Sequence, residues 1–461
     1  MNTNNSTACV GPKRRPLTIG LFLALAATGA SIATNVEAAT LPVTNCNDSG
    51  SGSLRDTVGA AMSGDTVDLF SQLHCSTITL TSGEIGVTKD DLSLIGSAGR
   101  NRVTIDGGGL DRVIAHYGRG TLSLTDLTVT HGRFQSNYGA SGGCLISGAN
   151  IKLINSTVSM CLANGLNGNS AYGGGIYTRG DLYLRGSTIT QNFVSGSRNN
   201  MSGGGALGGG AYVYGNLTAI DTTISKNLAE SADQSGKGGG LFTMGSALVS
   251  NSTISGNRAE VAAAWFANFY TGYPSASIIN STISGNFASV AVGGIDTRIP
   301  LHLSNSTIAF NSGALAGAYG NGLYSSGAAL TLQSSIIADN VIASTGAPSD
   351  LGGPLGGGVP VFGANNLITS GTNVVFPIGT IATCPKLGPL ADNGGLTQTH
   401  ALLHTSFAID TGNNAAILST DQRGSTYPRV VGFAADIGAY EWQGTPDDRL
   451  FVSGFETACD H

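Results

Sequence analysis

A short phrase that recurs through the middle of this 461-residue chain constrains its fold more than any other feature. The phrase pairs Ser or Thr with a β-branched residue, as in Asn-Ser-Thr-Ile at 251–254. Its aliphatic position falls at Val158, Ile189, Ile224, Ile254, Ile283, Ile308 and Ile337. Successive steps are 31, 35, 30, 29, 25 and 29 residues. A regular period of this size indicates a solenoid, a propeller or another repeat array.

Each repeat reads as short strands separated by corners. Two apolar residues at period 2, such as Leu182 and Leu184, precede the phrase, which is typical of a strand with one buried face. A residue type that tolerates left-handed backbone follows: Asn155, Gly186, Asp221, Asn251, Asn280 or Asn305. Three residues after the aliphatic position stands an Asn: Asn192, Asn227, Asn257, Asn286, Asn311 or Asn340. Stacked Asn side chains can hydrogen-bond along a column, so we expect this file to lie inside.

The repeat has no helical periodicity, and it is shorter than the roughly 40–45 residues of a propeller blade. The sequence therefore predicts an all-β fold, a right-handed single-stranded parallel β-helix, with an N-terminal capping helix and a small C-terminal domain. Strands of successive coils would pair at about 4.8 Å. Gly-Gly-Gly-Ile at 173–176 and Ile-Ser-Gly-Asn at 254–257 resemble the repeats of the polymorphic outer membrane protein class. That resemblance implies a β-helical surface protein.

The chain divides into segments of different composition. Residues 1–39 read as a signal peptide, because a basic stretch at 13–15 precedes an apolar stretch at 17–27; a twin-arginine export signal is an alternative. Residues 40–74 form an N-terminal cap with an amphipathic helix between Ser53 and Gly64. The sequence Gly-Ser-Leu-Arg-Asp at 52–56 resembles the entry segment of secreted bacterial β-helix proteins. Residues 75–345 form the β-helix, and 346–384 form a Gly/Pro-rich link and last coil.

Residues 385–443 carry a second set of motifs. Leu-Ala-Asp-Asn-Gly-Gly stands at 390–395, Asp-Gln-Arg-Gly at 421–424 and Asp-Ile-Gly-Ala-Tyr-Glu at 436–441. Together they closely resemble the choice-of-anchor Q domain, which implies an extracellular or cell-surface location. The tail at 444–461 contains Leu450–Glu456, which looks like a short sorting or capping strand. A net charge of −6 gives no basic stripe for nucleic acid.

Six of the seven cysteines remain after removal of the signal peptide. An even number in an exported chain suggests disulfides, and six cysteines allow 15 pairings. Sequence proximity favours Cys46 with Cys75, Cys144 with Cys161 and Cys384 with Cys459. Partial pairing with free buried thiols is the alternative.

Aromatic residues follow the inward position of one strand in several repeats. Tyr177, Tyr212, Phe242 and Tyr324 would point outward, with Asp296 in register. Such a stripe could stack on sugar rings or form an adhesive strip, or it could simply cover the sheet. The coil with Trp265, Phe266 and Tyr270 departs from the pattern, so it either protrudes or repacks.

The functional prediction is an exported surface or secreted protein with a binding, adhesive or structural role. Its partner would be a carbohydrate or a host or cell-surface ligand, with no nucleic acid and no integral membrane segment after signal removal. The alternative is a polysaccharide lyase or glycoside hydrolase acting on acidic polysaccharide. Arg179, Asp296 and Arg298 would face outward, but from separate coils.

We expect no catalytic set, metal site or cofactor. His400 and His404 have helical spacing but lack the Glu of the zinc-protease motif. Four acidic residues could build a calcium site, but such residues more often cap turns: Asp392, Asp410, Asp421 and Asp436.

Overall fold

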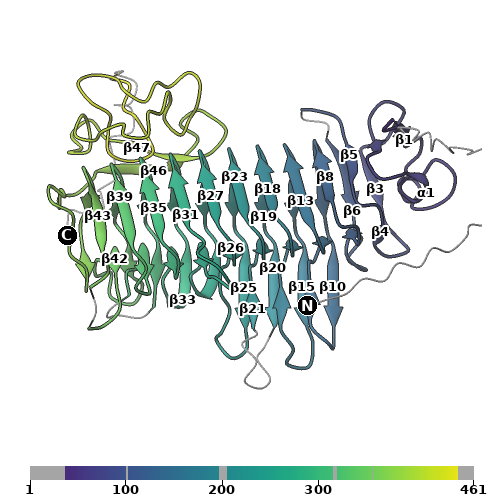
Figure 1. Ribbon diagram of the computed structural model, residues 1–461, viewed down its shortest axis with the longest axis horizontal. Coiled ribbons are helices and arrows are strands. Elements are labelled where there is room, and N and C mark those ends of the chain that lie inside the picture. The colour runs from purple at the N-terminus through teal and green to yellow at the C-terminus, as the bar shows by residue number, and fades with distance from the viewer. Residues whose placement is uncertain (1–36, 100–101, 197–204, 315–318, 357, 445–461) are drawn as a thin grey trace, which may run out of the picture. The chain divides into compact units, whose positions relative to one another are not determined.

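The computed structural model describes residues 37–99, 102–196, 205–314, 319–356 and 358–444. Most of the predicted signal peptide and tail, with Cys459, lies outside these residues. The described chain forms a parallel β-helix in which corresponding strands of successive coils pair side by side (Figure 1). This confirms the predicted all-β solenoid.

Three long sheets, called A, B and C, form the sides of the solenoid. Sheet A contains β1 (Thr40–Pro42), β2 (Thr66–Asp68), β5 (Leu92–Ile95), β8 (Thr121–Thr125), β13 (Asn150–Ile154), β18 (Leu182–Arg185), β23 (Leu217–Ile220), β27 (Ala247–Ser250), β31 (Ala276–Ile279), β35 (Leu301–Ser304), β39 (Leu330–Gln333) and β43 (Val361–Ala364). Sheet B contains β3 (Thr77–Thr79), β6 (Val103–Asp106), β9 (Leu127–Thr130), β14 (Thr157–Ser159), β19 (Thr188–Thr190), β24 (Thr223–Ser225), β28 (Thr253–Ser255), β32 (Thr282–Ser284), β36 (Thr307–Ala309), β40 (Ile336–Ala338) and β44 (Leu367–Ile368). Sheet C contains β4 (Ile85–Val87), β7 (Ile114–His116), β12 (Leu145–Ser147), β17 (Ile176–Thr178), β22 (Ala211–Val213), β26 (Leu241–Thr243), β30 (Trp265–Ala267), β34 (Ile295–Thr297), β38 (Leu323–Ser325), β42 (Leu351–Gly352) and β45 (Gly371–Thr372).

A fourth layer, which we call the fin, is inserted between sheets B and C in the middle coils. Its outgoing strands lie below the main solenoid in the view of Figure 1, and its short returning strands lead back to sheet C. The two sets pack through small side chains, among them Ala163, Ala171, Ala206 and Ala229. The outgoing strands are β10 (Arg133–Ser136), β15 (Leu162–Gly165), β20 (Phe193–Gly196), β25 (Leu228–Ser231), β29 (Arg258–Val261), β33 (Phe287–Ala291), β37 (Ser312–Gly313) and β41 (Val341–Ile342). The returning strands are β11 (Ala140–Ser141), β16 (Ala171–Tyr172) and β21 (Ala206–Leu207).

The repeated aliphatic residues form one interior file in sheet B. Val158 pairs in register with Ile189, and the file continues residue by residue to Ile337. Every member is 0% exposed. The corner before each strand is left-handed, with φ of 47° at Asn155 and 48° at Asn251 and Asn280. The periodicity therefore predicted both the register and the bends.

The Asn column is a buried ladder of amide hydrogen bonds. The Nδ2 of Asn192 donates to the Oδ1 of Asn227 at 2.9 Å, and the pattern repeats from coil to coil as far as Asn340. Each of these side chains also donates to a main-chain carbonyl of the preceding coil, as Asn257 does to Ile224. Asp350 ends the ladder by accepting from the main-chain N–H and the Nδ2 of Asn340. The predicted interior position is confirmed.

The N-terminal helix is shorter than predicted. Helix α1 spans Leu54–Ala60, with the predicted Ser53 as its N-cap and with Ala61, three residues before Gly64, as its C-cap. Leu54 and Val58 belong to the same hydrophobic core as the interior of the solenoid. Its role as a cap stays a prediction.

Two of the predicted disulfides are present. Cys46 is bonded to Cys75, and Cys144 is bonded to Cys161, with Cα atoms 6.3 and 5.4 Å apart. Cys384 is also disulfide-bonded, but its predicted partner Cys459 lies outside the described residues.

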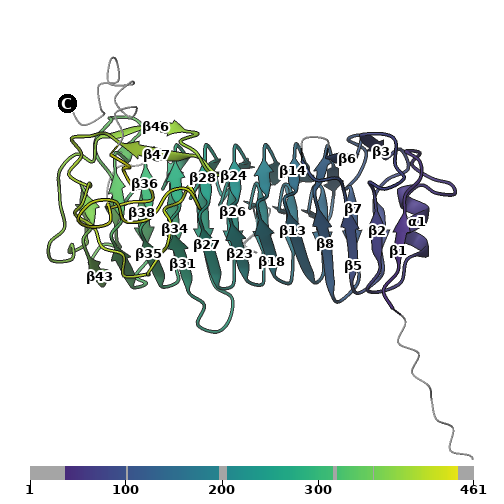
Figure 2. The same cartoon turned by 90° about the horizontal axis from the view of Figure 1, so that it is seen from above.

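The segment at 346–384 adds strands to the solenoid. β42, β43, β44 and β45 continue sheets C, A and B, so the Gly/Pro-rich stretch belongs to the last coil. Residues 385–444 then run back along the outer face of sheet B. Figure 2 shows the antiparallel pair β46 (Leu387–Ala391) and β47 (Thr399–Leu402) lying across β28 and β36. The hydroxyl of Thr253 donates to the carbonyl of Gln398, and Ser284 bonds to His400 at 2.8 Å.

Candidate functional site

The outward face of sheet C carries a file of stacked aromatic rings. Tyr177 pairs with Tyr212, Tyr212 with Phe242 and Phe242 with Phe266. Their ring centroids are 5.4, 5.1 and 5.1 Å apart with nearly parallel planes. The stacking follows from the parallel register, because like positions lie one strand spacing apart. The sequence pattern did not assign Phe266 to this file, because its coil lacks the Gly-rich turn of the other coils. Trp265 and Phe266 nevertheless follow the same alternation of inward and outward residues.

A tight turn brings each coil from the fin into sheet C and sets the position of these rings. Gly173, Gly208 and Gly238 start the turn with φ of 64°, 72° and 67°. A Cβ at Gly208 would collide with the carbonyl of Ala211. The fin thus lies against sheet C, and Leu207 of β21 and Val261 of β29 pack on the aromatic file.

Most of the aromatic file is buried, which corrects the expectation of an exposed stripe. Tyr212 is 8% exposed, Phe242 4% and Phe266 1%, because the fin covers them. Tyr177 and Tyr324 are only partly buried. Burial raises the pKa of the Tyr212 hydroxyl above the usual range of tyrosine. The predicted contact of these rings with a ligand stays a prediction, and only the two outer members retain exposed surface for it.

Asp296 interrupts the aromatic file. It pairs with Phe266 on one side and Tyr324 on the other, so it takes the position of a ring between them. The residue is 7% exposed, and burial raises the pKa of its carboxyl to about 6. The charges of Arg298 and Lys237 act against that shift. A carboxylate with this pKa changes protonation near neutral pH, which is suited to proton transfer.

Two cations converge on the ring beside this acid. The Nζ of Lys237 and the Cζ of Arg298 lie 5.1 Å from the centroid of Phe266. Lys237 comes from the fin, where it bridges to Leu207 and Val261, and Arg298 directly follows β34, the strand that carries Asp296. The side chain of Ser326 donates to Asp296 at 3.4 Å from the next coil. Lys237 precedes Asp296 by 59 residues and Arg298 by 61, so the stacking of coils brings this basic group to the other two.

Exposed aromatic residues flank the charged cluster. Tyr214 and Tyr270 lie with centroids 5.5 Å apart, and Tyr319 lies 5.1 Å from Tyr324. Tyr270 is 66% exposed and Tyr273 is fully exposed, so the coil that departs from the pattern does protrude. Sugar rings stack on such residues, and guanidinium groups bind carboxylates. This surface, from Tyr214 to Tyr324 around Asp296, is our candidate site.

The other predicted acidic and histidine residues have structural partners. Asp90 and Asp91 accept from the main-chain N–H groups of Arg119 and Thr121. His400 is buried, bonded to Gly388 and Ser284, and burial lowers its pKa to about 4. The described residues contain no group of three or more potential metal ligands placed to hold an ion.

The four acidic residues considered for calcium bind protein groups. Asp392 accepts from the N–H of Gly394, and Asp410 accepts from Phe433 and Ala434. Asp421 pairs with Arg423 at 2.7 Å, and Asp436 accepts from Asp410 and Trp442. Arg423 also lies between the rings of Tyr427 and Tyr440. These contacts support turn-capping and packing roles.

A buried ion pair completes the interior of residues 385–444. Arg429 and Glu441 are each 0% exposed in their side chains and lie 3.0 Å apart. Burial raises the pKa of Glu441 to about 7 and lowers that of Arg429. Because both groups are closed off from solvent, they hold the fold of this region and offer no site.

Comparison with known proteins adds little. No family model matches the chain, and no curated protein matches it. The resemblances to the choice-of-anchor Q domain and the polymorphic outer membrane proteins therefore stay predictions. A solved structure of pectate lyase Pel9A is similar with a TM-score of 0.41 and 14% identity over 87% of this chain and 96% of that chain. No helix among the described residues is both long and apolar enough to cross a bilayer.

Proposed function

We propose that this protein is exported and binds an acidic polysaccharide on the outer face of sheet C. The observation that carries the proposal is the convergence of Arg298 and Lys237 on the ring of Phe266, which pairs in register with Asp296. The disulfides are consistent with an oxidising compartment.

The surface fits an extended anionic chain in length and chemistry. Arg179, Tyr214 and Arg298 occupy the same outward row of sheet C on different coils. Four coil steps separate the two arginines, which corresponds to about 19 Å. Exposed rings between the cations can stack on sugars, while guanidinium groups pair with carboxylates.

A matched pair of arginines tests the proposal. Arg298 and Arg258 are both exposed, and each guanidinium lies over a phenylalanine ring. The distance from Cζ to the ring centroid is 5.1 Å for Arg298 and 5.0 Å for Arg258. Arg258 belongs to the fin strand β29 and lies over Phe287, outside the candidate site. Arg298→Gln should weaken binding to a polyuronate at least tenfold, whereas Arg258→Gln should leave it unchanged.

The binding is measured by affinity electrophoresis or calorimetry with a polyuronate and a neutral polysaccharide. Binding should weaken with added salt, because surface charge pairs are screened. Equal losses in both variants, or equal binding to the neutral polymer, would contradict a charge-reading site at Arg298.

Asp296 supports a second candidate function, cleavage of the bound polymer by β-elimination. A base removes the proton on the carbon next to the sugar carboxylate, and that electron pair forms a carbon–carbon double bond. The glycosidic carbon–oxygen bond then breaks, and its oxygen takes up a proton. Asp296, whose pKa is about 6, is placed to accept the first proton, while Arg298 and Lys237 offset the carboxylate charge.

The product gives this candidate a direct test. Unsaturated sugar ends absorb ultraviolet light, so cleavage is followed as rising absorbance. Asp296→Asn should abolish the rise but keep polyuronate binding. Binding with no unsaturated product in the unmodified protein would leave a binding protein and exclude elimination.

A further inference from the structure

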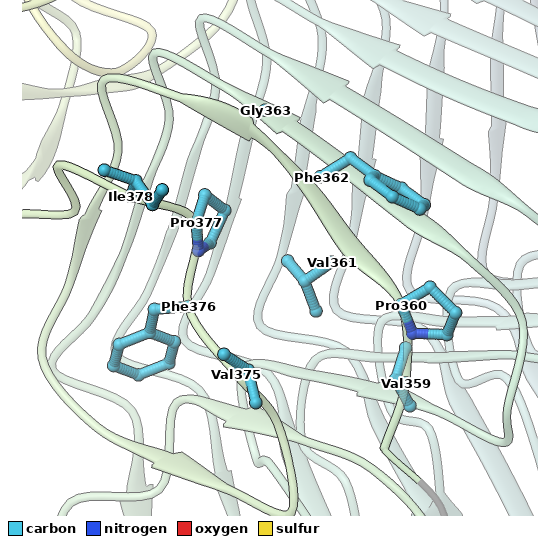
Figure 3. A pocket seen from close by; sticks show the side chains of 9 residues that line it. All are labelled: Val359, Pro360, Val361, Phe362, Gly363, Val375, Phe376, Pro377 and Ile378. Carbon is cyan, nitrogen blue, oxygen red and sulfur yellow. The ribbon is translucent and has the colours of Figure 1, made fainter.

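The last coil of the solenoid leaves an apolar pocket that the polysaccharide site does not use. Residues 359–363 and 375–378 line a cavity of about 450 Å³, and Figure 3 shows these two segments facing one another. Phe362 is 58% exposed, Val375 78% and Ile378 98%. Large apolar side chains gathered in this way indicate a surface that another apolar group covers.

The backbone at this pocket is suited to receive a strand. β43, which carries Val361 and Phe362, is the last strand of sheet A and pairs with β39 on one side. Its other edge has no strand partner among the described residues. Open strand edges are templates for the addition of a further strand.

The chain continues beyond the described residues. Trp442 packs against a hydrophobic cluster that includes Leu367 of β44, a strand of the last coil. The described residues end at Gly444, and 17 residues follow it. The six residues from Gly444 to Leu450 can span about 20 Å when extended.

A covalent link supports the same connection. Cys384, six residues after Ile378, takes part in a disulfide. Cys46, Cys75, Cys144 and Cys161 are bonded to one another in two pairs. Of the remaining cysteines, Cys459 is near the segment that would reach the pocket.

We propose that residues 450–455 pair with the free edge of β43 and place their phenylalanine side chains in the apolar pocket, held there by a disulfide between Cys384 and Cys459. The segment reads Leu-Phe-Val-Ser-Gly-Phe, which is rich in residues that favour strands. This inference is independent of the polysaccharide site.

Photo-cross-linking tests which group covers the pocket. A photoreactive phenylalanine analogue at position 362 should cross-link to residues 445–461, as mapped by mass spectrometry. The same analogue at Phe433, which is 99% exposed and away from the pocket, is the matched control. Mixing isotopically light and heavy protein distinguishes a cross-link within one chain from one between two copies.

Cross-links within one chain from position 362, at least tenfold above those from position 433, are expected. Cross-links that join light and heavy chains would overturn the proposal in favour of a second copy of this chain. Cross-linking at the level of the control would overturn it as well.

Charged substitutions in the tail provide a second measurement on the full chain. Phe451→Asp together with Phe455→Asp should uncover the pocket and increase the fluorescence of a dye that binds apolar surface several-fold. Phe433→Asp should not increase it. Equal fluorescence in the tail variant and the unmodified protein would show that these two rings do not fill the pocket. Disulfide mapping should recover the Cys384–Cys459 peptide, and a different partner for Cys384 would overturn the link.

Discussion

Two files of stacked side chains run along this β-helix with the same spacing, but one is polar and interior while the other is aromatic and lies on the outer wall. The amide groups of the Asn ladder are buried, and each finds its partner on the next coil. The rings of the outer file are covered by the fin and broken by Asp296. The Asn side chains are therefore buried with hydrogen-bond partners from the neighbouring coil, whereas the aromatic rings are buried by the packing of the fin.

The comparison also separates structural repetition from a candidate site. In the Asn ladder every coil repeats the same bond, so no position differs chemically from the next. In the aromatic file one position carries a carboxyl group with a raised pKa and two nearby cations. Packing alone does not explain a buried carboxyl group between two aromatic rings, and we assign the candidate site to Asp296 and its neighbours for this reason.

The largest effect is expected from breaking the polar file in its middle. Asn257→Leu removes the Oδ1 that accepts from both the main-chain N–H and the Nδ2 of Asn227. Two buried donors lose their acceptor, and each such loss costs about 1–3 kcal/mol. The free energy of unfolding should fall by about 3–5 kcal/mol, measured by denaturant unfolding.

An exposed asparagine provides the control for that substitution. Asn216 hydrogen-bonds to Asp181 at the surface of the solenoid, and Asn216→Leu should cost less than about 1 kcal/mol. Similar losses at the two positions would show that the ladder contributes nothing beyond an ordinary surface hydrogen bond.

The next effect distinguishes the covered and open parts of the aromatic file. Phe242 is buried between Tyr212 and Phe266, so Phe242→Ala should cost about 3 kcal/mol of stability through cavity formation. Changing Tyr177, at the open end of the file, to Ala should lower the stability by about 1 kcal/mol. Thermal unfolding measures both, and equal costs would mean that the fin does not seal the middle of the file.

The architecture could be predicted because its information is periodic. Ile254 and Asn257 occupy positions that repeat with each coil, so one coil predicts the next. The covering of Tyr212 and Phe242 could not be predicted in the same way. It depends on the fin, whose Ala-rich packing and variable loops carry no repeated motif as clear as the Asn-Ser-Thr-Ile phrase.

The candidate site was predicted only in part for a related reason. Asp296 and Arg298 were recognised as outward residues, since alternation along one strand reveals them. Lys237 comes from the fin, 59 residues before Asp296, and only the three-dimensional packing places both beside Phe266. Local alternation predicts a face, whereas convergence of distant segments needs the structure.

The pH dependence of stability sharpens the role of the charged break in the file. Burial raises the pKa of Asp296 from 3.8 to about 6, so the folded state holds this proton more tightly than the unfolded state. The stabilising contribution is complete below pH 3.8 and is lost as the pH rises through 6. Asp296→Asn should remove about 2 kcal/mol of the stability change between pH 4 and pH 7.

Other buried groups set the background for this measurement. Burial raises the pKa of Asp339 and Asp436 to about 6 in the same direction, whereas His400, lowered to about 4, acts in the opposite direction. The control Asp221→Asn places Asn at a left-handed corner where other coils already have it. An unchanged pH profile for Asp296→Asn relative to this control would contradict a buried, titrating acid in the file.

The smallest effect is expected where the Asn ladder ends. The carboxylate of Asp350 accepts from the main-chain N–H and Nδ2 of Asn340 and from the hydroxyls of Thr369 and Ser370. Asp350→Asn replaces one acceptor oxygen with an NH₂ group, but a hydroxyl can rotate and accept from it. Stability should therefore fall by only about 1 kcal/mol. Asp350→Leu, which removes every acceptor, should cost about as much as Asn257→Leu. If the two Asp350 variants unfold at the same denaturant concentration, the ladder does not need an acceptor at its end, and the two files would differ less than their chemistry suggests.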